Sequence, residues 1–127
     1  MTEFVNHPNH YTACGGEIGP DGTPKYEAIK VIESWSLGFC LGNAVKYLLR
    51  APHKGTERQD LAKALWYLER NSDKATAFET PSFDPVAVAT AWKLPEALKV
   101  VLVCIERERN TGKAAAHHLR RYLGDLK

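Results

Sequence analysis

Four side chains with the chemistry to bind an anionic ligand recur at helical spacing within GFCLGNAVKYLLR, residues 38–50. They are Asn43, Lys46, Tyr47 and Arg50. Their positions i, i+3, i+4 and i+7 share one face of a helix, whereas the apolar residues of the segment fall at the spacing of a buried face. The segment therefore predicts an amphipathic helix whose polar face carries amide, phenol and cationic groups.

A second stripe follows at i, i+3, i+7 and i+10, formed by Asp60, Lys63, Tyr67 and Arg70. The short connection 52–56 predicts an antiparallel hairpin, in which the two stripes share a groove. Four cations would give the groove positive potential, with His53 and Lys54 at the turn, and Trp66 would add stacking surface beside the tyrosines. Such a groove suits a phosphate attached to a flat base. The alternative is that Asp60 and Glu69 pair with the cations and that the tyrosines cap the core.

The segment HPNHY, residues 7–11, is the other place where chemistry is concentrated. His7 and His10 are candidate catalytic residues for proton transfer, and Tyr11 is a candidate for substrate binding. Pro8 stiffens the segment, which we expect to fold back onto the groove. A zinc ion would need two further ligands at suitable spacing, so the sequence predicts no metal site.

Composition limits the classes of protein that this chain can belong to. Its 127 residues suit one domain, 1–127, and 44% hydrophobic with 25% charged residues is ordinary for a globular protein. A net charge of +2 argues against general nucleic-acid binding. Three cysteines without a CxxC pair favour a reducing cytosol, and no apolar run is long enough for a signal or a membrane span.

The elements that must position these residues are helices. Apolar periodicity and caps predict helices over 24–36, 39–51, 57–72, from Pro85 onward, 94–109 and 113–126, after an irregular segment over 1–23. Thr23 is the expected N-cap of the first helix, and Thr56 to Gln59 is a capping box for the third. Asp84 is the expected N-cap of the helix that starts at Pro85. No segment alternates as a strand does, so the sequence predicts an all-α helical bundle.

An internal repeat joins the two halves of the chain. Val31-x3-Trp35-x-Leu37-x3-Leu41 recurs 57 residues later, which predicts two helix-turn-helix hairpins, within 1–72 and 84–127, about a pseudo-two-fold axis. The alternative is that any two helical hairpins look alike. Asn43, Lys46 and Tyr47 become Val100, Val103 and Cys104, so we expect the second copy to be the buried scaffold and binding to be confined to the first.

Three stretches in order carry a resemblance: VNHPNHY (5–11), YEAIKVIESWSLGFCLGNAVKYLLRAPHKG (26–55) and DLAKALWYLER (60–70). Together they resemble a family of small bacteriophage proteins of unknown function, often labelled nucleotide kinase. The resemblance implies a deoxynucleoside monophosphate kinase of the bacterial host cytoplasm that transfers a phosphoryl group from a nucleoside triphosphate. Lys46, Arg50, Lys54 and Lys63 would clamp phosphates, His7 and His10 would orient the acceptor, and Mg²⁺ would arrive with the nucleotide.

A non-catalytic function is equally open to such a surface. Small phage proteins bind host proteins or sequester nucleotides, and a basic, aromatic face would serve both purposes. The chain has no ExxE motif, one of the two motifs with which all-α nucleotide pyrophosphohydrolases hold magnesium, so that mechanism lacks ligands that it needs. The sequence leaves homo-oligomer formation open.

Overall fold

The computed structural model describes residues 14–71, 82–108 and 111–125. These residues form α2 (Ala28–Ser34), α3 (Phe39–Arg50), the 3-10 turn η1 (Ala51–His53), α4 (Glu57–Arg70), α5 (Pro85–Ala91), α6 (Glu96–Arg107) and α7 (Lys113–Asp125). Within the described ranges there is no strand beyond an isolated bridge between Ile18 and Pro24, so the all-α prediction is confirmed. None of the helices in these ranges has the length and apolarity needed to cross a membrane.

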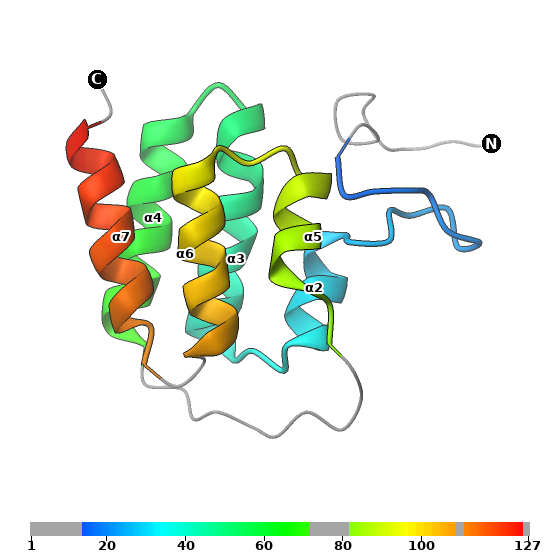
Figure 1. The fold of residues 1–127 in the computed structure, drawn as a ribbon, viewed down its shortest axis with the longest axis horizontal. Coiled ribbons are helices and arrows are strands. Elements are labelled where there is room, and N and C mark those ends of the chain that lie inside the picture. Colours follow the sequence, from blue (N-terminus) through cyan, green and yellow to red (C-terminus); the bar gives the residue numbers. More distant parts are fainter. Residues whose placement is uncertain (1–13, 72–81, 109–110, 126–127) are drawn as a thin grey trace.

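The helices pack in pairs around one core. α3 packs along α4 and α6 along α7, while α2 and α5 lie against α3 and α6 (Figure 1). The two hairpins meet through α4 with α7 and through α3 with α6. The largest fully buried aliphatic side chains come from both hairpins: Leu41, Leu48, Leu49, Leu61, Leu98, Leu102, Ile105 and Leu119.

The internal repeat is present in the structure. α2 and α5 are both 7 residues long, α3 and α6 are both 12, and each pair starts 57 residues apart. The turns recur too, since Ser36 and Lys93 have φ of 54° and 57°, and Gly55 and Gly112 have φ of 75° and 72°. We call residues 28–70 the first repeat and 85–125 the second.

Reciprocal hydrogen bonds from two tryptophans join the repeats. Nε1 of Trp35 donates to the carbonyl of Phe83, and Nε1 of Trp92 donates to the carbonyl of Tyr26, both at 2.8 Å. Tyr26 and Phe83 are themselves 57 residues apart, and their rings meet edge to face with centroids 4.8 Å apart. Both indoles are buried, at 0% and 5% exposure, so the prediction that they are equivalent core residues is confirmed.

One predicted helix start and two predicted caps were wrong. The first helix begins at Ala28 rather than at 24, because Pro24 pairs with Ile18 and the hydroxyl of Thr23 donates to Asp21 instead of capping a helix. α4 begins at Glu57, as predicted, but no side chain caps it, and the hydroxyl of Thr56 donates to the carboxylate of Asp60 at 3.0 Å. The cap at α5 is as predicted, with the Val86 amide donating to Asp84.

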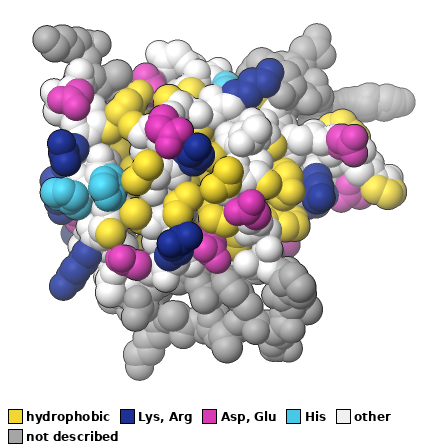
Figure 2. All heavy atoms as spheres, in the orientation of Figure 1, with side chains coloured by type: hydrophobic (Ala, Val, Ile, Leu, Met, Phe, Trp, Pro, Cys, Tyr) yellow, Lys and Arg dark blue, Asp and Glu magenta, His cyan; other side chains and the backbone are white. Residues whose placement is uncertain are grey.

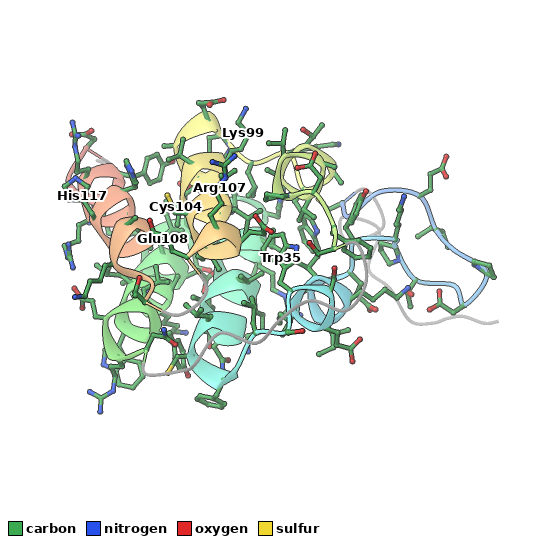
Figure 3. All side chains as sticks on the ribbon, turned by 60° about the horizontal axis from the view of Figure 1, so that its bottom comes forward. Trp35, Lys99, Cys104, Arg107, Glu108 and His117 are labelled. Atoms are coloured by element: carbon green, nitrogen blue, oxygen red, sulfur yellow. The ribbon has the colours of Figure 1, made fainter. Side chains whose placement is uncertain are left out.

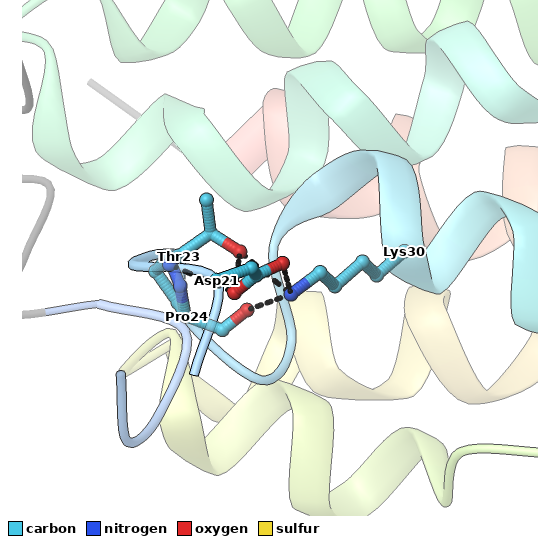
Figure 4. Close-up of polar contacts among 4 residues, drawn as sticks. All are labelled: Asp21, Thr23, Pro24 and Lys30. Carbon is cyan, nitrogen blue, oxygen red and sulfur yellow. Dashed lines mark hydrogen bonds and ion pairs between the residues drawn. The ribbon is translucent and has the colours of Figure 1, made fainter. Parts of the chain in front are cut away.

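The Gly/Pro-rich loop over 15–24 is attached to α2 by one lysine. Nζ of Lys30 lies 3.0 Å from the Asp21 carboxylate and donates to the Thr23 hydroxyl at 2.6 Å and to the Pro24 carbonyl at 3.3 Å (Figure 4). Asp21 also accepts from the amide and hydroxyl of Thr23. These bonds hold the pKa of Asp21 well below its usual range, the Thr23 hydroxyl contributing most and Lys30 next.

The expectation that the second repeat supplies the buried scaffold helix was wrong. α3 buries six residues and α6 buries four. α3 is in contact with α2, α4 and α6, so its inward face meets neighbours over a wide arc. The cationic stripe therefore lies on a central helix of the bundle.

Candidate functional site

The α3–α4 hairpin brings the two predicted stripes together through their tyrosines. The rings of Tyr47 on α3 and Tyr67 on α4 lie with centroids 6.1 Å apart and planes 14° from parallel. Phe39 and Trp66 meet the Tyr67 ring nearly edge on, with centroids at 5.8 and 5.0 Å. Phe39 is 72% exposed and Trp66 is 52% exposed, so the aromatic row reaches solvent.

Cations lie over these rings. Nζ of Lys46 is 4.8 Å and Nζ of Lys63 is 5.5 Å from the centre of the Tyr47 ring, and the guanidinium of Arg70 lies 4.5 Å from Trp66. Such contacts hold a positive charge near an aromatic surface without neutralising it. We name this surface the cation–aromatic face; its residues are Phe39, Lys46, Tyr47, Lys63, Trp66, Tyr67 and Arg70.

The carboxylates nearest in sequence pair with other cations. Asp60 is buried at the turn and lies 3.8 Å from Nζ of Lys54, and Glu69 binds Arg120 of α7 at 3.1 Å. The alternative is thus correct for Lys54, which pairs with Asp60, and for Tyr47 and Tyr67, which pack against the core. Neither acid pairs with Lys46 or Lys63 in the described residues. The sequence itself places no Asp or Glu between Glu33 and Glu57.

The α3 stripe continues toward α2. Nδ2 of Asn43 donates to the Phe39 carbonyl one turn earlier at 2.8 Å, and Arg50 occupies the last turn, half-buried. A shallow hollow of about 350 Å³ lies beside this stripe, lined by Ile32, Leu37, Gly38, Phe39, Gly42, Asn43 and Lys46. An added Cβ at Gly42 would come within 3.2 Å of Ile32, so glycine permits the close approach of α2. The hollow gives a ligand on the face one partly apolar recess.

Two residues expected to contribute to the groove at its turn, His53 and Lys54, instead make contacts within the fold. Lys54 is engaged with Asp60, which removes it from the predicted phosphate clamp. Nε2 of His53 lies 2.6 Å from the carbonyl of Trp92, where it must donate, and 3.6 Å from the buried thiol of Cys14. Burial raises the pKa of that thiol, against a smaller lowering by Lys93. His53 and Lys54 therefore hold the fold together at this end.

His7, His10 and Tyr11 lie outside the described residues. Their predicted roles in proton transfer and substrate binding stay predictions, as does the folding of this segment onto the groove.

Sequence reasoning missed Phe39. It is the first residue of α3 and precedes Asn43 by four positions, so helical spacing alone extends the stripe to it. It follows directly on Gly38 at the start of α3, where no further element covers it among the described residues.

This arrangement can bind a ligand that is both flat and anionic. The aromatic rings offer stacking surface and the unneutralised cations offer charge-assisted hydrogen bonds. In the described part of the chain, no three His, Cys, Asp or Glu side chains gather as metal ligands.

The fold and the site together define a class of protein. It is an all-α bundle with an internal repeat, and its first repeat carries a cation–aromatic face. Residues 5–69, just over half of the 127, match the model of a family of proteins of unknown function, DUF3310. The chain belongs to this family. The matched segment contains α2, α3 and nearly all of α4, and the second repeat lies beyond it. No curated protein and no solved structure matches the chain.

Proposed function

We propose that the cation–aromatic face binds a nucleotide, with the base against the exposed rings and the phosphate on the cations. One observation carries the proposal: Lys46 and Lys63 converge on the Tyr47 ring while Asp60 and Glu69 pair elsewhere. Two cations held close together, with no carboxylate between them in the described residues, repel one another. A phosphate placed on them relieves that repulsion and gains charge-assisted hydrogen bonds.

Phosphoryl transfer is the reaction that we propose for this site, consistent with the resemblance noted from the sequence. Such transfer needs cations to hold phosphates and a group to orient the acceptor. The face supplies cations through Lys46 and Lys63, and Arg50 lies one turn after Lys46 on α3. The acceptor would be oriented by His7 or His10, so catalysis depends on residues outside the described ranges.

Nucleotide binding can be tested by thermal unfolding against a panel of nucleoside mono-, di- and triphosphates. A ligand at 100 times its dissociation constant should add roughly 2.7 kcal/mol to the free energy of unfolding. Lys46→Gln and Lys63→Gln should each remove most of this stabilisation. Lys25→Gln is the matched control, because Nζ of Lys25 lies 5.3 Å from the Tyr26 ring, outside the face. Equal stabilisation of all three variants would contradict the proposal.

Catalysis needs a separate measurement. We expect ATP and a deoxynucleoside monophosphate to yield two diphosphates, and we expect His7→Ala or His10→Ala to lower turnover while nucleotide binding persists. Binding without turnover in the unchanged protein would reduce the function to nucleotide sequestration.

A protein partner is the second candidate, favoured by the exposure of Phe39 and Trp66. Exposed aromatic side chains flanked by arginine are typical of interface hot spots. In that case the nucleotide panel would leave the unfolding temperature unchanged. The unchanged chain would capture a host protein, and the Trp66→Ala variant would not.

A further inference from the structure

The outward side of α6 carries a short stripe that neither the core nor the cation–aromatic face uses. Its residues are Glu96, Val100, Val103 and Arg107, at positions i, i+4, i+7 and i+11. The buried residues of the same helix are Leu98, Val101, Leu102 and Ile105. Helical geometry places these two sets on opposite sides, so the stripe faces away from the core. We call it the α6 stripe.

The two central residues of the α6 stripe are apolar, although packing within the chain does not require it. Val100 and Val103 are half-buried, and α5 and α7 flank α6 in Figure 1. Hydrophobic side chains gather over this side of the molecule in Figure 2, interspersed with charged ones. At the equivalent positions of the first repeat, the same fold accepts Asn43 and Lys46. An apolar pair at Val100 and Val103 is therefore not required by packing within the chain.

Charges at the two ends of the stripe are complementary. Glu96 lies in the first turn of α6 and Arg107 in the last, about 16 Å apart along the helix, too far for one to reach the other within one chain. Glu96 contacts Lys99 at 2.8 Å, yet its side chain remains 76% exposed and can accept further bonds. Figure 3 labels Lys99, Cys104 and Arg107 along α6, with His117 on the neighbouring α7.

The order of the stripe is self-complementary. The spacings of four, three and four residues read the same from either end, with an acid at one end and a base at the other. Two α6 helices in antiparallel contact therefore place Glu96 against Arg107 of the partner subunit at both ends of the contact. Val100 meets Val103 of the partner subunit in the middle. A contact in which the same patch serves both copies is the form that two-fold dimers take.

We propose that the chain forms a two-fold homodimer through the α6 stripe. Because α3 and α6 touch through the core, their outward stripes point away from one another. The dimer thus leaves the cation–aromatic face open on each subunit. The dimer proposal therefore does not depend on whether the face binds a nucleotide.

Sedimentation equilibrium of the full chain tests the proposal by charge exchange. Glu96→Arg and Arg107→Glu should each weaken dimerisation about tenfold or more, since every substitution places like charges together at both ends of the contact. The double variant, Glu96→Arg with Arg107→Glu, should restore the dimer. Restoration must act between chains, because the two residues cannot meet within one.

Glu17→Arg is the matched control, an exposed charge reversal in the loop before α2, and it should leave the dimer unchanged. Circular dichroism of each variant separates loss of association from loss of folding. Three results would overturn the proposal: an unchanged protein that is monomeric throughout, a dimer that withstands both single reversals, or a double variant that stays dissociated. If a single variant fails to fold, the comparison rests on the remaining reversal and on Val103→Asp, which should also dissociate the dimer.

Discussion

α3 and α6 are the same element used twice, and they differ where they face solvent. Both are 12 residues long, follow a buried tryptophan and bury apolar residues at equivalent positions. Their outward residues, in order, are Phe39, Asn43, Lys46 and Arg50 on α3, and Glu96, Val100, Val103 and Arg107 on α6. The core restricts the inward positions, whereas the outward ones are free to carry binding. We infer an anionic, flat ligand for the first repeat and a second copy of the chain for the other.

The largest effect that we expect tests whether the two repeats share one core. Trp35→Ala and Trp92→Ala should each lower the free energy of unfolding by about 3–5 kcal/mol, because each removes a buried ring and leaves a carbonyl just before the other repeat without its donor. Urea denaturation measures both. A loss of less than about 1 kcal/mol at one site, beside a large loss at the other, would mean that the repeats are not equivalent.

A smaller effect concerns the one outward position at which α3 and α6 carry the same residue, Arg50 and Arg107. Arg50→Lys should weaken nucleotide binding by about tenfold, because lysine lacks the planar fork that binds a phosphate through two hydrogen bonds. Arg107→Lys, the same substitution 57 residues later, should leave the affinity unchanged. Isothermal titration calorimetry compares the two variants. Equal losses would show that the arginines act through folding and not through a site on α3.

The smallest effect concerns the Gly/Pro-rich loop over 15–24, which precedes the first repeat. The pKa of Asp21 is lower in the folded chain than in the unfolded chain, chiefly through the Thr23 hydroxyl and Lys30 (Figure 4). Its stabilising contribution is therefore complete above the ordinary carboxyl pKa, near 4, and is lost as the pH falls toward the folded value.

The protection of the Thr23 amide, which donates to Asp21, is its hydrogen-exchange rate relative to the intrinsic rate at the same pH. We expect this protection to persist at pH 5 and to be lost only in stronger acid. Asp21→Asn should lower the protection at every pH relative to the unchanged chain. A loss of protection already between pH 6 and 5 would mean that another group fixes the loop.

Local patterns sufficed for much of the fold. The helix periods, the Asp84 cap and the 57-residue repeat all depend on neighbours in sequence, and the structure bears them out. The start of α2 and the caps expected at Thr23 and Thr56 were wrong, and both threonine hydroxyls donate to nearby aspartates. Which partner such a hydroxyl takes depends on the path of the loop, which residue types alone do not determine.

The candidate site was predictable to a similar extent. Helical spacing joined Lys46 and Tyr47 on one face, and the short connection after α3 brought Lys63 and Tyr67 beside them. The loss of Lys54 to Asp60 depends on how deeply the turn buries that aspartate. The contact of His53 with Trp92 joins residues 39 positions apart, so no local pattern reveals it.

The most direct test uses α6 as an internal control for α3. A titration of ¹⁵N-labelled protein with a deoxynucleoside monophosphate, followed by heteronuclear correlation spectra, reports on every amide at once. We predict saturable shifts within residues 39–50 and 60–70 and unchanged positions within 96–107. Shifts of equal size in both helices, or no saturable shift in either at millimolar nucleotide, would contradict a nucleotide site on the first repeat.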